Sequence, residues 1–457
     1  MSAIVIFRFV LYYMVSFLSA SPICLLAAEN MPRAGIGRSE ITNHHIFYRQ
    51  DKRAPLTSIE IVFLGAGRNQ ERPSQMGLAE TTAWLIKEYA KTHGYLDQLS
   101  ALGTRLNVIT STRYQRIAIP TLSENCGKSV EIVRDIIHNL DFSESDLKKV
   151  KKLKLADYEN DIRRRTHTFM RNFALAQTRG IKKLNSLKTL KDLSLEDVRQ
   201  YYARLLKTDV VFFKVISDLD STQVAELLLP ITETRQRGGF EHSLKFPTAD
   251  YSINPSAFVY TNYSRLKSVF CHWLIPFGSI GGEDHIPTLI SYTLSHYPGL
   301  LHHYLREEWG LAYSLYCRTR LSGDIRYLDI YADPQLQNSE ELIVKMSDFI
   351  RGLSDNPRFW EALKERREIL KVSDVHNQTP QRSLDREINR AIYNTPIHKG
   401  SYDSITDDEV RAFLEKFFVP ENMIMIFVGP KDHIIDILNK HLPEVDIRVH
   451  DVKELIE

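Results

Sequence analysis

The sequence predicts an α+β protein of two homologous halves, each a mixed β-sheet covered by helices in a sandwich-like arrangement. Two observations lead to this prediction. A helix followed by a buried strand recurs once near residue 200 and again near residue 410, and a stretch rich in Gly, Pro and polar residues separates the two occurrences. The recurring unit is longer than a solenoid repeat, so it indicates a duplicated domain.

The recurring unit begins with an amphipathic helix in each half. The two helical runs are Leu193–Leu206 and Ile405–Phe418, and they agree in character position by position. Each opens with a capping-box pattern, in which a hydroxyl residue is followed three residues later by an acid. These pairs are Ser194 with Asp197 and Thr406 with Glu409.

A buried strand and a second helix follow each of these helices. The strand runs are Asp209–Ile216 and Met423–Val428, which are apolar and rich in β-branched and aromatic residues. The repeat places the halves at residues 35–232 and 254–445, with a linker at 233–253 and a tail at 446–457.

Strands and helices are mixed inside each half rather than strictly alternating. The first half is expected to hold a strand at Ile59–Leu64, a helix at Gly77–Thr92, a strand pair within Arg105–Pro120 and helices over 125–180. The second is expected to hold a strand at Ser268–Ile275, a helix near 285–307 and strands near 312–332.

Composition excludes several classes of protein. Hydrophobic residues make up 43% and charged residues 25%, which is ordinary globular usage, and the net charge of +2 does not favour nucleic acid as a partner.

Cys126, Cys271 and Cys317 are widely spaced, so either one disulfide forms or all three are buried thiols.

The N-terminus carries a targeting signal. Residues 1–28 hold a single charge, Arg8, followed by an apolar stretch and small residues, with cleavage expected after Ala20 or Ala28. If the segment is not cut, residues 9–28 are long enough to anchor the chain in a membrane. We therefore expect export to the periplasm or cell envelope.

Three phrases carry a family resemblance. They are Val62–Arg68, Met76–Ala79 and Leu305–Ser314. With the duplicated units, they make the chain similar to the insulinase/pitrilysin superfamily of zinc metallopeptidases, which includes the subunits of the mitochondrial processing peptidase. The duplicated fold of that superfamily agrees with the repeat.

The zinc motif of that superfamily is degenerate here. In active members Gly-Leu-Ala runs into His-x-x-Glu-His, whose histidines bind Zn²⁺ and whose Glu activates water. The corresponding residues here include Glu80, Ala83 and Trp84, and the third ligand would fall near Glu159 or Asp161. One carboxylate cannot hold a catalytic zinc ion, which needs about three protein ligands. The resemblance thus implies no metal in this chain and zinc in a partner subunit.

A second motif is retained. In the superfamily an Arg and a Tyr seven residues apart, here Arg306 and Tyr313, reach toward the zinc site of the other half or subunit. Both side chains donate hydrogen bonds, which suits a peptide carbonyl or a developing oxyanion. The structural alternative is an Arg that favours a helix end through the dipole and a Tyr that packs in a strand.

These features predict a non-catalytic subunit that forms a heterodimer with a homologous zinc-bearing peptidase and acts on peptides. The rival is a catalytically dead scaffold or peptide-binding protein of the same fold. An active enzyme with unusual zinc ligands is a third alternative.

Overall fold

The computed structural model describes most of the chain from residue 45 to 452. The described residues are 45–68, 71–111, 113–164, 166–177, 187–207, 211–232, 256–261, 267–279, 285–297, 299–322, 325–376, 379–393 and 402–452. The predicted signal segment 1–28 and linker 233–253 lie outside them. None of the helices in these ranges is long and apolar enough to cross a membrane.

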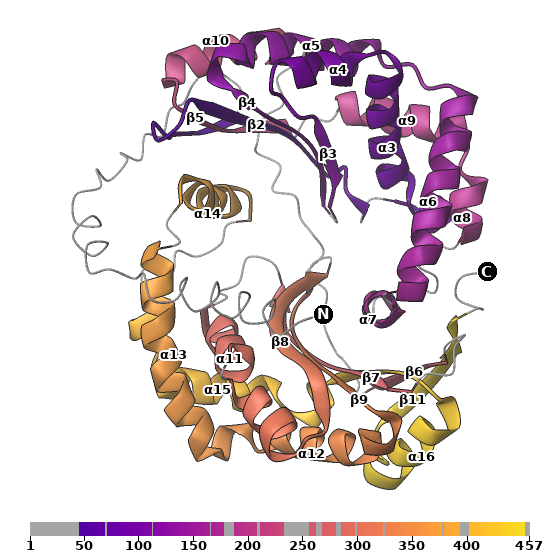
Figure 1. Ribbon diagram of the computed structural model, residues 1–457, viewed down its shortest axis with the longest axis vertical. Coiled ribbons are helices and arrows are strands. Elements are labelled where there is room, and N and C mark those ends of the chain that lie inside the picture. Colours follow the sequence, from indigo (N-terminus) through magenta and orange to yellow (C-terminus); the bar gives the residue numbers. More distant parts are fainter. Residues whose placement is uncertain are drawn as a thin grey trace, which may run out of the picture. The chain divides into compact units, whose positions relative to one another are not determined.

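The first half forms a five-stranded mixed sheet in the order β1-β5-β2-β4-β3 (Figure 1). Its strands are β1 (His45–Gln50), β2 (Leu56–Leu64), β3 (Asn107–Thr110), β4 (Tyr114–Leu122) and β5 (Val211–Ser217). Its helices are α3 (Leu78–Thr92), α4 (Tyr95–Ala101), α5 (Cys126–Asn139), α6 (Glu144–Arg164), α7 (Thr166–Gln177), α8 (Leu187–Asp192), α9 (Leu195–Lys207) and α10 (Ser221–Thr232). β5 is parallel to β1 and antiparallel to β2.

The second half forms a six-stranded mixed sheet in the order β11-β6-β10-β7-β9-β8. Its strands are β6 (Ser256–Thr261), β7 (Phe270–Ser279), β8 (Ala312–Ser322), β9 (Ile325–Pro334), β10 (Ile424–Val428) and β11 (Asp446–Asp451). Its helices are α11 (His285–Ser295), the π-helix η4 (His302–Glu308), α12 (Ser339–Arg351), α13 (Pro357–His376), α14 (Pro380–Tyr393), α15 (Asp407–Phe417) and α16 (Lys431–His441).

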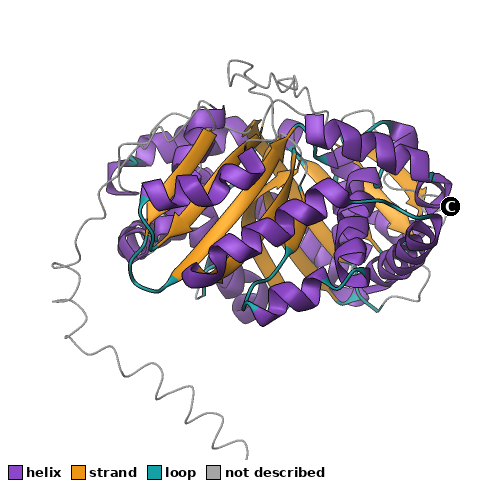
Figure 2. Cartoon of the chain, turned by 90° about the horizontal axis from the view of Figure 1, so that it is seen from above, coloured by secondary structure: helices purple, strands orange, loops and turns teal. Residues whose placement is uncertain are grey.

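Each half has its own core between its sheet and most of its helices. The core of the first half includes Ile61 and Val215 from the sheet and Leu85 from α3. The core of the second includes Trp273, Leu328 and Phe427, all of which are fully buried. Viewed from above, the helices lie alongside the strands that they cover (Figure 2). The predicted α+β fold of two helix-covered mixed sheets is therefore confirmed.

The two halves also exchange helices. Met170 and Phe173 of α7, from the first half, pack on the second sheet against Leu274 and Ile426. In return, α14 of the second half places Leu384 and Ile388 on β2 and β5 of the first sheet. Figure 1 shows α7 beside β7 and α14 beside β2 and β5. Each sheet is thus covered on its second face by a helix from the other half.

The duplicated helix–strand units agree with the sequence prediction. α9 leads to β5 and α10, and α15 leads to β10 and α16. Both capping boxes form, because Asp197 accepts the Ser194 backbone N–H at 2.8 Å and Glu409 accepts that of Thr406 at 2.7 Å. Local sequence alone therefore determines where these two helices begin.

Two segments differ from the prediction. Residues 446–451, expected within a tail, form β11, which pairs in parallel with β6. The single helix expected near 285–307 is two elements, α11 and η4. Between them the backbone turns tightly at Gly299, where a Cβ would lie 2.7 Å from the Leu294 carbonyl oxygen.

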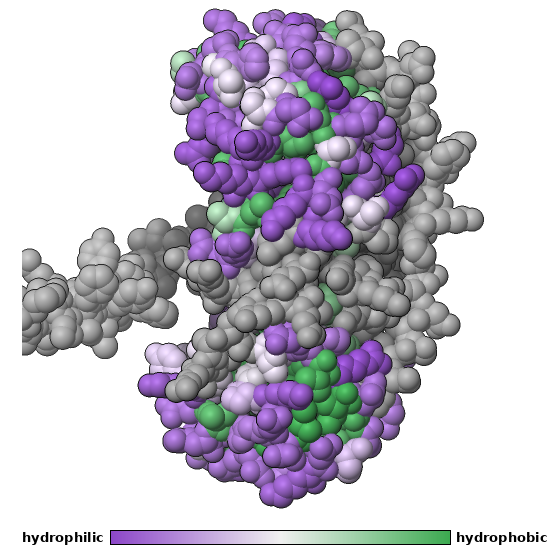
Figure 3. Space-filling view, turned by 90° about the vertical axis from the view of Figure 1, so that its right-hand side faces the viewer, coloured by the Kyte–Doolittle hydropathy of each residue, from purple (hydrophilic) through white to green (hydrophobic). Residues whose placement is uncertain are grey.

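The surface and the interior separate by polarity. On the face in Figure 3, hydrophilic side chains cover most of the described surface, and a hydrophobic patch lies within the second half.

Cys126, Cys271 and Cys317 are buried free thiols, and burial raises their pKa values. The structure therefore favours buried thiols over a disulfide.

Candidate functional site

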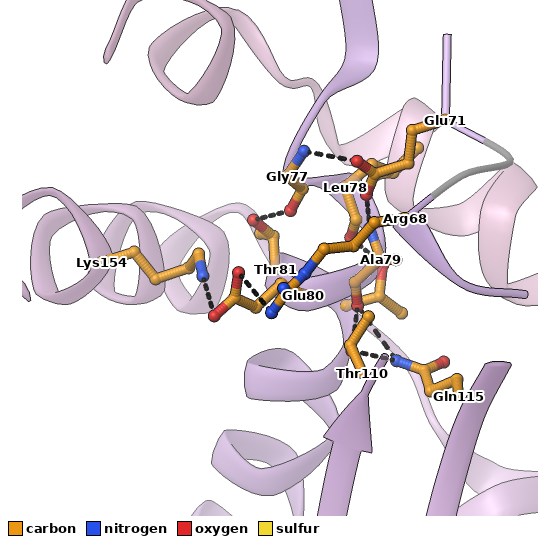
Figure 4. Close-up of polar contacts among 11 residues, drawn as sticks. Arg68, Glu71, Gly77, Leu78, Ala79, Glu80, Thr81, Thr110, Gln115 and Lys154 are labelled. Carbon is orange, nitrogen blue, oxygen red and sulfur yellow. Dashed lines mark hydrogen bonds and ion pairs between the residues drawn. The ribbon is translucent and has the colours of Figure 1, made fainter. Parts of the chain in front are cut away.

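The N-terminus of α3 carries the positions of the lost zinc motif. Gly77 precedes the helix with a φ of 93°, in the left-handed region. The Glu71 carboxylate accepts the backbone N–H groups of Gly77 at 2.8 Å and Ala79 at 2.7 Å (Figure 4). Burial raises the pKa of Glu71 to about 7 despite these two hydrogen bonds. The helix start is thus fixed by a side chain six residues upstream.

The carbonyl of the same turn is tied to the sheet. The Gln115 side-chain amide donates to the Ala79 carbonyl at 3.0 Å, and the Thr110 hydroxyl donates to it at 3.4 Å (Figure 4). Because Gln115 lies on β4 and Thr110 on β3, the first turn of α3 is held against the edge of the first sheet.

Glu80 forms ion pairs with two cations. Its carboxylate lies 3.3 Å from the Lys154 ammonium and 3.6 Å from the Arg68 guanidinium (Figure 4). The Lys154 ammonium also lies 5.6 Å from the centroid of the Trp84 ring. The side chain of Lys154 is only 10% exposed, and burial lowers its pKa although the Glu80 charge opposes that shift.

The residues at these positions do not fit a zinc ion. Trp84 offers no metal donor, Ala83 is buried, and the one carboxylate, Glu80, is bound to cations. Glu159 is exposed, and the side chain of Asp161 lies outside the described part of the structure. Across the described residues, no three His, Cys, Asp or Glu side chains come close enough together to hold a metal.

Sequence reasoning missed Lys154 and Arg68. It placed the α6 residue opposite the zinc motif near Glu159 or Asp161, whereas Lys154, on the same helix, makes the contact to Glu80. No local pattern marks this lysine, because it lies within a run of basic residues typical of a solvated helix face. The ion pair joins α3 to α6.

Arg306 and Tyr313 are brought together in the second half. The Arg306 guanidinium lies 4.7 Å from the centroid of the Tyr313 ring, and both side chains are exposed. Arg306 belongs to the π-helix η4, which ends before Gly310, a left-handed residue with a φ of 64°. Tyr313 then follows near the start of β8. Gly310 therefore separates the helix that carries Arg306 from the strand that carries Tyr313.

A third constellation was not expected from the sequence. The carboxylate of Asp329 on β9 accepts hydrogen bonds from Arg171 at 2.7 Å, Arg320 at 2.9 Å and Tyr316 at 3.3 Å. His272 Nδ1 is 2.7 Å from the other carboxylate oxygen, so it donates to Asp329. These partners hold the pKa of Asp329 at about 2, although its burial acts in the opposite direction.

Comparisons with known proteins give a family model and a relative that match this chain. Residues 192–367, which include Arg306 and Tyr313, match the family model described as "Peptidase M16 inactive domain". Over 377 residues the chain is 21% identical to the non-peptidase homolog YmxG of Helicobacter pylori. This alignment covers 77% of this chain and 83% of that protein. The chain is thus similar to the M16 peptidase family, through the inactive-domain model that matches residues 192–367. This chain lacks the His-x-x-Glu-His residues of active members of that family.

Solved structures extend the likeness of the fold to most of the length of this chain. The M16 inactive-domain protein from Pseudomonas fluorescens superposes with a TM-score of 0.70 at 15% identity, over 85% of this chain and 96% of that one. A chain of complex III2 from Candida albicans superposes with a TM-score of 0.66 at 12% identity, over 87% and 96%. At these identities the likeness concerns the fold.

Proposed function

We propose that this chain is the non-catalytic, Arg/Tyr-bearing subunit of a two-component zinc peptidase. A homologous partner supplies the zinc ion, the water and the general base, and this chain supplies Arg306, Tyr313 and part of the surface that binds peptides. The observation that carries the proposal is the pairing of Arg306 with Tyr313, in a chain whose α3 motif offers a single carboxylate, Glu80, that is already paired with cations.

The geometry suits donation to a peptide. A guanidinium stacked on a ring keeps its N–H groups in its own plane, where they remain available to an acceptor. The Tyr313 side chain is 76% exposed, so it too can reach a peptide held by another subunit. Together the two side chains give donors on the side of a scissile carbonyl opposite the metal.

The partner and the compartment belong to the same proposal. The partner is a zinc-bearing homologue, and the substrates are peptides in the periplasm or cell envelope, reached through the N-terminal signal. The M16 family comparison supports this division of labour, because the matched model is that of an inactive domain.

The test is hydrolysis of a quenched fluorescent peptide library. This chain and its zinc-bearing homologue are assayed separately and as an equimolar mixture. We expect activity that is far higher in the mixture, sensitive to a chelator, and reduced about 10²-fold or more by Arg306→Ala or Tyr313→Phe. Leu321→Ala, another exposed side chain of β8, serves as the matched control and is expected to leave the rate unchanged.

A scaffold without any enzymatic role is the second candidate. The likeness to a chain of complex III2 favours it at the level of the fold. Stable association of the two chains with no gain in hydrolysis would move the assignment to this scaffold.

A further inference from the structure

Helix α7 presents two side chains to one buried carboxylate of the second sheet. His167 and Arg171 are four residues apart, so they lie on the same face of the helix. The Arg171 guanidinium donates to Asp329 at 2.7 Å. The His167 ring stacks on that of His272, with centroids 5.7 Å apart, and His272 donates to the same carboxylate. We call His167, Arg171, His272 and Asp329 the α7 cluster.

His167 lies among aromatic rings that accept its neutral form. Its ring centroid is 5.0 Å from that of Phe270 and 5.2 Å from that of Tyr331. A protonated ring in this position would be partly cut off from water and would stand near the Arg171 cation. Burial first, and then the charges of His272 and Arg171, lower the pKa of His167 to about 4, although the nearby carboxylate opposes this shift. His167 is therefore neutral in the packed helix down to about pH 5.

Other ionisable groups surround α7 on the strands that it faces. Arg320 and Tyr316 of β8 donate to Asp329 at 2.9 and 3.3 Å, and the pKa of Asp329 is about 2, so this carboxylate stays ionised in mild acid. The remaining groups are Tyr158 on α6, Tyr260 on β6, Tyr327, Tyr331 and Asp333 on β9, and Arg448 and His450 on β11. Burial raises the pKa values of these tyrosines, so they stay neutral. Asp333, whose pKa burial also raises, and His450 can take up protons in mild acid as well.

Three buried polar atoms at this contact have no hydrogen-bond partner among the described residues. They are Nε2 of His272, Nε of Arg171 and the hydroxyl of Tyr260. Because water cannot reach them while α7 covers the sheet, each of these atoms raises the free energy of the closed state. Met170 and Phe173, both fully buried, oppose opening through their apolar contacts. The contact therefore combines apolar groups that favour closure with polar groups that favour opening.

We propose that the α7 cluster is an acid-responsive switch, in which protonation of His167 detaches α7 from the second sheet while both halves remain folded. Detachment exposes the apolar face of that sheet, which α7 otherwise covers. The switch needs neither Arg306 and Tyr313 nor a zinc-bearing partner.

The direction of the response depends on which state of His167 binds the proton more tightly. In the detached helix its pKa returns toward the ordinary 6.5, whereas in the closed helix it is about 4. The closed state is thus most stable above about pH 6.5 and loses stability as the pH drops toward 4. Between pH 7.5 and 5 these two values raise the equilibrium constant for detachment about 30-fold.

The test is amide hydrogen exchange of the full chain at pH 7.5 and 5, followed by mass spectrometry and corrected for the intrinsic pH dependence of exchange. We expect the opening constant of α7 peptides to rise about 30-fold or more at pH 5. Peptides of α3 and α16 should change by less than about threefold, because they lie outside the contact. Unchanged exchange of α7 would overturn the proposal. An equal rise in α3 and α16 would contradict it too, since acid would then unfold the whole chain.

Variants identify the group that responds to acid. His167→Phe keeps a ring between Phe270 and Tyr331, and His167→Gln keeps a neutral polar side chain. Either variant should reduce the acid response of α7 at least about tenfold. His450→Phe is the matched control, because His450 faces Phe173 of the same helix, with ring centroids 6.1 Å apart, and it should retain the wild-type response. A full response in both His167 variants, or its loss in His450→Phe, would assign the switch to another group and refute the role of His167.

Discussion

The guanidinium of Arg171 on α7 lies 2.7 Å from the carboxylate of Asp329 on β9, with side-chain exposures of 6% and 0%. The two residues belong to different halves, so the ion pair holds a helix of the first half on the sheet of the second. At the other exchanged helix, α14, the charges are the other way round. There the helix carries the acid, Asp385, which lies 2.5 Å from Lys214 on β5 of the sheet. Each exchanged helix is thus attached through a charge as well as through apolar contacts.

Removing the Asp329 carboxylate should destabilise the chain strongly. Asp329→Asn leaves the buried Arg171 cation without its counter-charge, which typically costs about 3–5 kcal/mol. The free energy of unfolding from urea titration measures the loss. The control is Asp141→Asn, since the Asp141–Arg199 pair is exposed and its loss should cost less than about 1 kcal/mol. Similar losses in the two variants would show that the buried pair has no special role.

Acid should weaken the attachment of α7. Burial lowers the pKa of His167 to about 4, helped by the charges of His272 and Arg171, and burial also lowers that of His272. Both histidines therefore take up protons at higher pH in the unfolded chain than in the folded one, so stability is complete above about pH 6.5 and falls as the pH drops toward 4. Thermal melts at pH 7.5 and 5 measure the effect. His167→Phe, which keeps a ring between Phe270 and Tyr331, should lose less stability over this interval than the wild type.

The zinc site should return only if Lys154 is replaced as well. The variant Glu80→His, Ala83→Glu and Trp84→His restores the motif but leaves the Lys154 ammonium beside it, so we expect weak zinc binding. Adding Lys154→Glu supplies a third ligand and should raise the zinc content toward about one ion per chain, measured by atomic emission after dialysis. Tight binding in the first variant would mean that Glu159 or Asp161 provides the third ligand, as the family resemblance implies.

Replacing Gly310 in the turn between η4 and β8 should lower the free energy of unfolding. Its φ of 64° is strained for any residue with a Cβ, yet no atom lies within 4 Å of an added Cβ, so the cost of Gly310→Ala is conformational and about 1 kcal/mol. Denaturant unfolding measures this loss. Gly127→Ala in α5 is the control, because that position has no positive φ and its nearest contact would be a flexible leucine at 3.4 Å. A neutral Gly310→Ala would show that the turn tolerates a side chain.

The features that the sequence predicted well are those encoded by neighbouring residues. The capping boxes at Ser194 and Thr406 involve groups only three residues apart. The family phrases likewise placed Arg306 and Tyr313 at a helix end and a strand start. Local chemistry was sufficient in each case.

The features that the sequence did not reveal depend on distant partners. Lys154 meets Glu80 across 74 positions, and Arg171 meets Asp329 across 158. The exchanged helices α7 and α14 carry ordinary amphipathic patterns, which indicate that one face is buried but not by which sheet. For the same reason β11 was interpreted as a tail, since its pairing with β6 leaves no mark in six residues of sequence.

The exchange of α7 and α14 has a consequence for how the chain can be divided. A fragment that stops at Thr232 would retain the first sheet but lose α14, exposing the apolar side chains of Val62, Leu64 and Phe212 to water. Such a fragment would be prone to self-association, because an exposed apolar sheet face binds the exposed apolar surfaces of other molecules. We therefore expect that neither half folds stably alone, and that the smallest autonomous folding module of this protein contains both.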